Sequence, residues 1–284
     1  MQIVSDRGAD LSPEQMEGLN IHFAPLRLTL DGQTYESGVN ISPAEFSKLL
    51  LQTDSFPITS QPSAGDFVQL YRKLAETDPE ILSVHISSGL SGTLNSAKQA
   101  AAMVPEAHVK FVDTKTLSAP EGWQVEVAAR AALMGLPVEQ IQEMLKKIRQ
   151  NSEGLFTLNG LKYLIHGGRI SHMKGLIASL LNIKPIIGVE QEQGIYISHG
   201  QEVTLKRALN KMVDVVAGIF PGVGQLRVQL LHGDNPGAVE YLRERMQMHF
   251  DIRWDPVVSV APVLVAHTGP SLVGLAVGPA SVFD

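Results

Sequence analysis

The chain contains no cysteine and has few aromatic or charged residues. The lack of cysteine excludes disulfides, thiol nucleophiles and thiolate metal sites. Aromatic residues make up 6% of the chain and hydrophobic residues 44%, so most of the apolar content is aliphatic. That composition is typical of a packed sheet covered by helices, and it is unlike a surface that stacks bases or sugars.

Positive charge is also scarce. The 284 residues include 23 Lys and Arg against 29 Asp and Glu, which gives a formal net charge of −6. No strongly basic stretch offsets this balance, so we expect no nucleic-acid partner. The first residues lack the basic region and long apolar stretch of a signal peptide. We therefore expect a cytoplasmic protein that makes at most transient membrane contact.

The segment from Pro256 to Phe283 is long enough to cross a bilayer, and His267 is its only ionisable side chain. Prolines and glycines divide it into short pieces, however. We therefore expect two or three buried strands with turns in this segment, in place of a membrane helix.

Strands and helices alternate through the first half of the chain. Serine caps followed by Glu, Gln or Asp predict helices that start after Ser12, Ser42 and Ser63. The run from Ile81 to Ser88 is typical of a buried strand, and a hairpin turn is expected at Asp31-Gly32. This alternation predicts an α/β fold with a mainly parallel N-terminal sheet and flanking helices.

The second half predicts a mixed sheet with helices. Residues 186–190 and 194–198 flank a polar turn and form an expected hairpin, and residues 205–219 form an expected helix. A helix that stops at Gly167-Gly168 is followed by another expected from Ser171 to about Asn182. We expect two domains, an N-terminal one over residues 1–155 and a C-terminal one over residues 156–284.

The loop from Ser87 to Thr93 lies between an expected strand and an expected helix. At such a junction, free N–H groups of the helix N-terminus can receive an anion, and the Ser and Thr hydroxyls add neutral donors. The alternative is an ordinary turn in which Gly89 and Gly92 serve the backbone geometry and the serines serve as caps.

A second hydroxyl-rich loop, Thr59-Ser60-Gln61-Pro62-Ser63, also precedes a helix start and contains no basic residue. A plain turn explains this loop equally well. Together the two loops favour a small anion such as a carboxylate, because no P-loop lysine or dinucleotide-binding glycine motif is present. A regulatory module that binds a phosphorylated metabolite at the same loops remains an alternative.

His267 stands alone in its apolar segment. A neutral imidazole can donate and accept, so His267 could orient a hydroxyl, or it could be a satisfied core residue. Ser91, followed by Asp234 or Asp251 and then His267, also has the chain order of a hydrolase triad. Thr93 stands where the nucleophile elbow requires glycine. A serine esterase using Ser91 and His267 is therefore the alternative function.

Metal binding has little support, since no His or carboxylate pattern has ligand spacing. We expect neither a metal nor a cofactor. Lys206, Arg207 and Lys211 form a small basic face on an expected helix, and such a face is usually solvated surface.

The chain resembles the DegV family over essentially its whole length. The resemblance is carried, in order, by short motifs at Thr59–Ser63, Ser88–Thr93, Gly167–Ile170, Lys184–Ile186 and His267–Pro270. Two differences stand out. Asp6-Arg7 replaces the Asp-Ser pair that is common in the family, and Glu36 replaces an Asp that commonly follows the tyrosine.

The resemblance implies a non-catalytic carrier that buries a long-chain fatty acid between two α/β domains. It implies that Thr59, Ser60, Ser91, Gly92, Thr93 and His267 bind the carboxylate or support that network. Some members of the family present the acid to a fatty acid kinase for phospholipid synthesis, and Arg207 is then a possible contact with that partner. No cofactor is implied beyond the fatty acid itself.

Overall fold

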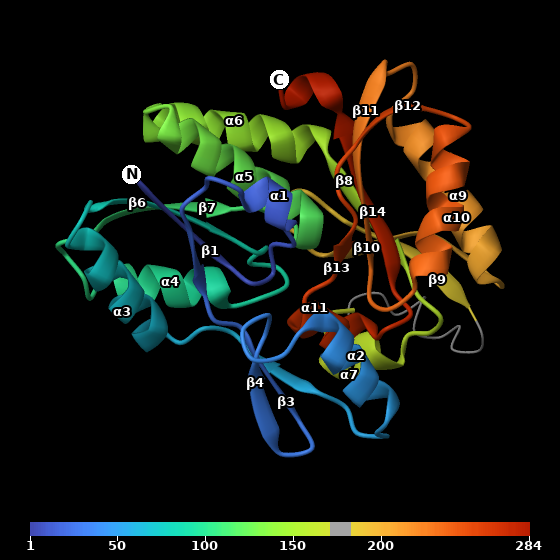
Figure 1. The fold of residues 1–284 in the computed structure, drawn as a ribbon, viewed down its shortest axis with the longest axis horizontal. Helices are drawn as coiled ribbons and strands as arrows, with labels where there is room; N and C mark the ends of the chain where they lie inside the picture. The colour runs from blue at the N-terminus through green and yellow to red at the C-terminus, as the bar shows by residue number, and fades with distance from the viewer. Residues whose placement is uncertain (171–182) are drawn as a thin grey trace.

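The computed structural model describes residues 1–170 and 183–284, and these fold around two large β-sheets and one small one. In Figure 1 the N-terminal sheet and its helices lie on the left, and the C-terminal sheet and its helices lie on the right. The small sheet lies below them. The fold is therefore a mixed α/β arrangement, as the alternating pattern predicted.

The N-terminal sheet is fully parallel and has the order β2-β1-β6-β7. Its first strand is flanked by β2 and β6, so the strand nearest the N-terminus is central. The parallel arrangement confirms the sequence prediction. The strands are β1 (Gln2–Asp6), β2 (Ile21–Ala24), β6 (Glu80–His85) and β7 (His108–Asp113).

Helices cover both faces of this sheet. Phe67 and Ala97 pack on one face and Ala128 and Leu145 on the other, in two separate buried clusters. The expected caps are confirmed, since the side chains of Ser12, Ser42 and Ser63 each complete a capping box. The helices around this sheet are α1 (Pro13–Met16), α3 (Ala64–Ala75), α4 (Thr93–Ala101), α5 (Ser118–Leu133) and α6 (Val138–Asn151).

The small sheet is antiparallel, with the order β4-β3-β5. Asp31 and Gly32 both have positive φ, at 50° and 79°, which is the geometry of the tight turn expected there. Because β5 pairs with β3, Thr59 lies opposite Leu28 at the inner end of the sheet. The elements are β3 (Arg27–Leu30), β4 (Gln33–Glu36), β5 (Ile58–Ser60) and the neighbouring helix α2 (Pro43–Leu51).

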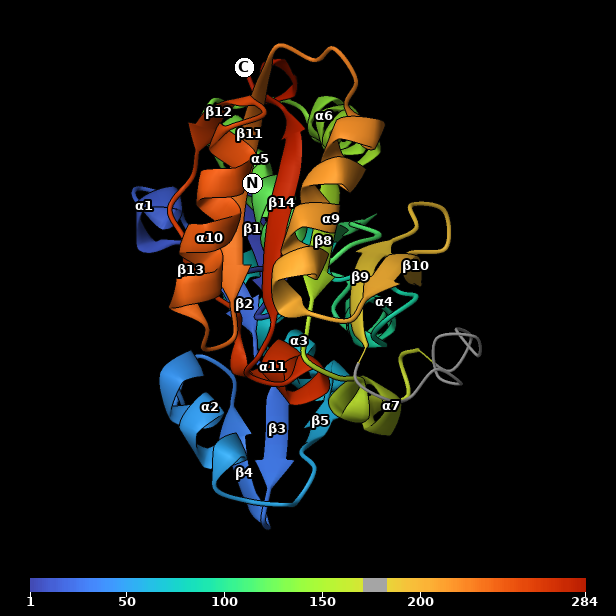
Figure 2. The same ribbon diagram turned by 90° about the vertical axis from the view of Figure 1, so that its right-hand side faces the viewer.

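The C-terminal sheet is mixed, as predicted, with the order β10-β9-β8-β14-β11-β12 and with β13 also paired to β11. Two helices, α9 (Leu205–Ile219) and α10 (Pro236–Gln247), cover one face (Figure 2). The other face turns toward the small sheet and the N-terminal half. The strands are β8 (Glu153–Thr157), β9 (Lys184–Val189), β10 (Tyr196–Glu202), β11 (Gln225–His232), β12 (Asp251–Trp254), β13 (Val258–Ser259) and β14 (Val273–Pro279).

Several local predictions in this half are confirmed. The β9–β10 hairpin forms, and α7 (Lys162–Gly167) ends at Gly168 with a φ of 75°. The helix expected from Ser171 to about Asn182 lies outside the described residues. The expected division between residues 155 and 156 falls within β8, which belongs to the C-terminal sheet.

The prediction of strands throughout residues 256–283 is wrong in part. Between β13 and β14 the chain forms a helix, α11 (Pro262–Thr268), and it ends in a 3-10 turn, η1 (Ala280–Val282). Nearly every residue of α11 is buried, so the helix shows no one-sided apolar pattern that would distinguish it from a strand. Among the described helices, none combines the length and apolarity needed to cross a membrane.

A buried ionic cluster joins the two halves. Arg227 of β11 donates to Glu126 of α5 and to Asp255, each at 2.7 Å. Its guanidinium lies over the ring of Trp123 at 4.8 Å and over that of Phe283 at 4.7 Å. These contacts hold α5 against the C-terminal sheet.

Candidate functional site

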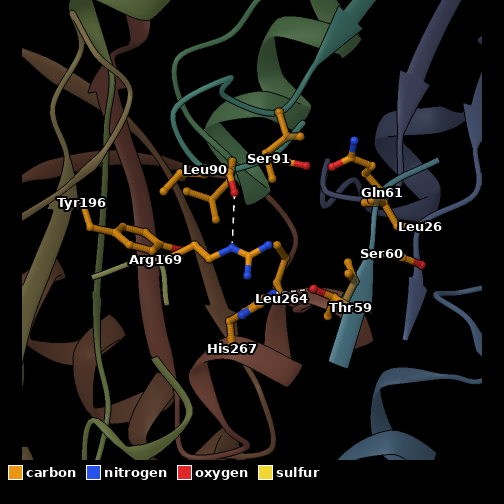
Figure 3. A pocket seen from close by; sticks show the side chains of 13 residues that line it. Leu26, Thr59, Ser60, Gln61, Leu90, Ser91, Arg169, Tyr196, Leu264 and His267 are labelled. Atoms are coloured by element: carbon orange, nitrogen blue, oxygen red, sulfur yellow. Dashed lines mark hydrogen bonds between the residues drawn. The ribbon is translucent and has the colours of Figure 1, made fainter. Parts of the chain in front are cut away.

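A cavity of about 290 Å³ lies where the small sheet, α11 and the loop after β6 meet. Its lining combines hydroxyl, amide, imidazole and guanidinium groups with aliphatic side chains (Figure 3). We call it the polar cavity. It is lined by Leu26, Thr59, Ser60, Gln61, Ile86, Leu90, Ser91, Leu117, Arg169, Tyr196, Val263, Leu264 and His267.

Four of the residues predicted to bind the carboxylate, Thr59, Ser60, Ser91 and His267, line this cavity. They come from β5, the loop after β6 and α11, segments that are far apart in the sequence. Gly92 and Thr93 do not line it. Thr93 is buried behind Ser91, and its hydroxyl lies 2.9 Å from the Ser91 hydroxyl.

His267 lies near the end of α11 and not on a strand as expected. Its Nε2 is 2.8 Å from Oγ1 of Thr59. Burial lowers the pKa of His267 to about 4, and the positive charge of Arg169 and the nearby His166 add to this effect. The imidazole is therefore neutral near pH 7. Within the described residues, Nδ1 has no hydrogen-bond partner.

The close approach of α7 explains why residue 167 is glycine. A Cβ atom at position 167 would collide with Nδ1 of His267. The same helix end carries Arg169, whose Nε donates to the Leu90 carbonyl at 3.4 Å. In Figure 3 the arginine extends across the cavity from the side of Tyr196. The Gly167-Gly168 helix stop thus brings α7 against His267 and a cation into the cavity.

Arg169 and Gln61 are site residues that the sequence reasoning missed. Both lie in motifs that carry the family resemblance, but the sequence alone assigns a role to neither. The Gln61 amide packs against Gly92, and its Nε2 donates to Ser96 at 3.2 Å. Gln61 thereby covers the beginning of α4, where free backbone N–H groups were expected to face an anion. Arg169, which is exposed at the cavity, instead provides a positive charge.

A second, apolar cavity of about 40 Å³ adjoins the first. Leu117, Tyr196 and Leu264 line both cavities, so these three side chains form the boundary between them. We call it the apolar cavity. Its other lining residues are Thr116, Ser118, Pro120, Gly154, Leu155, Phe156, Val189, Leu231, Val260, Thr268, Leu272 and Leu275.

The hydrogen bonds do not form a hydrolase triad. The Ser91 hydroxyl bonds to Thr93, while His267 bonds to Thr59. In the part of the chain that the structure describes, no carboxylate contacts Nδ1 of His267. Asp251 instead accepts from the Gln225 side chain at 3.3 Å. The geometry therefore does not favour an esterase mechanism through Ser91.

Arg207 lies outside both cavities, in the first turn of α9. Its side chain is 66% exposed and pairs with Glu202 at 3.1 Å. Over residues 1–170 and 183–284, no group of His, Asp and Glu side chains could hold a metal ion.

The fold and the site define a two-part α/β protein that encloses a polar cavity bordering an apolar one. A family model described as "Uncharacterised protein, DegV family" matches residues 1–280. The chain belongs to the DegV family, which confirms the resemblance seen in the sequence motifs.

Relatives and solved structures agree with this assignment. A DegV domain-containing protein of Staphylococcus aureus strain N315 is 34% identical over 276 residues, which is 97% of each chain. A fatty acid-binding DegV family protein of Thermus thermophilus has a TM-score of 0.90 at 29% identity, covering 98% of this chain and 99% of the other. A stearic acid-binding protein of Eubacterium ventriosum has a TM-score of 0.88 at 26% identity, covering 98% of each chain.

Proposed function

We propose that this protein binds a long-chain fatty acid, with the carboxylate in the polar cavity and the acyl chain in the apolar cavity. The observation that carries the proposal is the shared boundary of Leu117, Tyr196 and Leu264 between a polar and an apolar cavity. An amphiphile with one anionic end matches this pair of environments. The fatty acid binding described for the Thermus thermophilus protein and the stearic acid binding described for the Eubacterium ventriosum protein support the same ligand class.

The carboxylate would be held by hydroxyl donors and one cation. A neutral His267 that carries its proton on Nε2 donates to Thr59, which leaves the Thr59 hydrogen free for the ligand. Nδ1 has no partner among the described residues in either tautomer, so the bond to Thr59 is the contact through which His267 orients this hydroxyl. Ser60 and Ser91 add donors, and Arg169 adds charge complementarity.

The acyl chain would supply most of the affinity. A sixteen-carbon acid has about fourteen methylenes, and at ~0.8 kcal/mol each their burial provides roughly 11 kcal/mol before association costs. The apolar cavity of about 40 Å³ is only a few times the roughly 10–15 Å³ that a single water needs, so it is too small for an extended acyl chain. We infer that its walls move apart when the acyl chain enters.

The proposal extends to how the protein is used. We propose residues 1–155 and 156–284 as the two domains, with the ligand between them and with no catalysis by the protein itself. The bound acid would be presented to a fatty acid kinase, and Arg207 is proposed as a contact with that partner. The exposure of Arg207 supports this role. We propose no nucleic-acid partner and at most transient membrane contact.

Native mass spectrometry of the purified protein tests the ligand assignment. We expect a bound mass equal to one long-chain fatty acid, and expect the Ser60→Ala, Ser91→Ala double variant to lose it faster. A Ser55→Ala, Thr77→Ala double variant removes two exposed hydroxyls outside the cavities and serves as the control. A folded wild-type protein that retains and binds no acyl ligand would refute the proposal.

A further inference from the structure

Asp10 links two helices that line the apolar cavity, although it lines neither cavity itself. It lies in the loop between β1 and α1 and is 6% exposed. One carboxylate oxygen accepts from the Ser118 hydroxyl at 2.5 Å, and the other accepts from the Ala261 backbone N–H at 2.9 Å. A single buried carboxylate thus joins segments that are more than a hundred residues apart.

Each partner of Asp10 lies at the start of a helix that contributes side chains to the lining of the apolar cavity. Ser118 is the first residue of α5 and lines the cavity together with its neighbour Leu117 and with Pro120. It has a φ of +58°, a conformation that a non-glycine residue keeps only when its surroundings hold it. Ala261 is the N-cap of α11, which contributes Leu264 to the same cavity.

Helix α11 depends on such ties because it has only seven residues, too few for a stable isolated helix. Its first turn is held by Asp10 at Ala261 and by the Ser37 hydroxyl, which accepts from Val263 N–H at 3.1 Å. Its other end is held by the bond between His267 and Thr59. These anchors all come from the first 60 residues of the chain.

We propose that Asp10 is a positioning residue that sets the separation of α5 and α11 and thereby the acyl-chain selectivity of the apolar cavity. This inference rests on the proposed fatty-acid function. With the start of each helix tied to the same carboxylate, the cavity can widen only on its other sides. A straight chain and a kinked chain need different cross-sections, so a fixed separation discriminates between them.

The test compares dissociation rates of octadecanoate and cis-9-octadecenoate, which have equal length and differ in the kink. Asp10→Ala removes both ties. Ser118→Gly removes only the tie to α5, and glycine accepts the positive φ without strain. Asp10→Asn is the conservative variant, because its amide can accept from Ala261 and donate to Ser118. Ser12→Ala, a buried cap in the same loop that touches neither cavity, is the matched control.

We expect Asp10→Ala to release the better-retained acid at least tenfold faster and to bring the ratio of the two rates at least threefold closer to one. Ser118→Gly should act in the same direction to a smaller extent. Asp10→Asn and Ser12→Ala should keep the wild-type ratio within twofold. General destabilisation would speed the release of both acids equally, so the ratio separates positioning from a purely structural role.

A wild-type protein that holds both acids equally, or an Asp10→Ala variant with an unchanged ratio, would overturn the inference. So would a Ser12→Ala variant that changes the ratio as much as Asp10→Ala does. Should Asp10→Ala fail to fold, an unchanged ratio in Ser118→Gly overturns it. A wild-type protein that binds neither acid refutes the proposed function itself, which is a distinguishable result.

Discussion

The charge of Arg169 should contribute to affinity only when the ligand carries a carboxylate. Replacing Arg169 by Gln removes the cation that the structure places in the polar cavity while keeping a polar, though shorter, side chain. Hydrogen bonds to charged groups contribute about 1.5–3 kcal/mol when they are shielded from water. Because Arg169 is exposed, solvent screening reduces this to roughly 1–2 kcal/mol.

That loss corresponds to an increase in Kd of about 5- to 30-fold for palmitate. Isothermal titration calorimetry on delipidated protein measures it, with methyl palmitate as the uncharged comparison ligand. The Kd for methyl palmitate should stay within twofold, and the palmitate effect should shrink in 1 M salt, where the Debye length is about 3 Å. Arg169→Lys should fall between Gln and wild type, because lysine keeps the charge but not the planar fork.

Lys162→Gln is the matched control, since Lys162 is an exposed cation on α7 that does not line the polar cavity. The reasoning fails if Arg169→Gln weakens palmitate and methyl palmitate equally, because Arg169 would then act by packing. It also fails if Lys162→Gln weakens palmitate as much, because the effect would then come from general surface charge.

Three further predictions concern stability and reactivity. Arg227→Ala leaves Glu126 and Asp255 without their buried cation. Urea titrations should show a free energy of unfolding that is lower by about 3–5 kcal/mol. A loss below about 1 kcal/mol would show that the cluster does not hold the two halves together. Because the pKa of His267 lies at about 4 against 6.5 for a free histidine, the unfolded chain binds more protons between these pH values. The contribution of His267 to the free energy of unfolding should therefore be complete above pH 6.5 and should fall by about 3 kcal/mol toward pH 4. His267→Gln should remove this pH dependence. Identical pH profiles of stability in the wild type and the variant would contradict the prediction. A fluorophosphonate probe should leave Ser91 unlabelled, whereas labelling that Ser91→Ala abolishes would establish the esterase.

The pH comparison requires the variant because other buried groups titrate in the opposite sense. Burial raises the pKa of Asp10 and of Glu153 to about 7. Because the folded protein binds these two protons more tightly than the unfolded chain does, each carboxyl group adds to the free energy of unfolding at low pH. That contribution is lost as the pH rises through 7. The difference between wild type and His267→Gln at each pH cancels these shared contributions and isolates the histidine.

The sequence by itself determined the local structure wherever the controlling interactions lie within a few residues. The serine capping boxes, the Asp31-Gly32 turn and the helix stop at Gly168 all formed as predicted. Each depends on a short-range hydrogen bond or on a backbone conformation that few residue types adopt. The hydroxyl loops could be recognised for the same reason, because their residue types are typical of strand-to-helix junctions.

Only the tertiary structure decided how those segments meet. Helix α11 is buried on nearly all sides, so no periodic apolar pattern in the sequence distinguishes it from a strand. Arg169 enters the polar cavity because α7 packs against His267, and Gln61 covers the start of α4 because β5 pairs with β3. These contacts join residues about 30 to 100 positions apart, and their geometry follows from packing of the whole core, which local residue pattern does not encode.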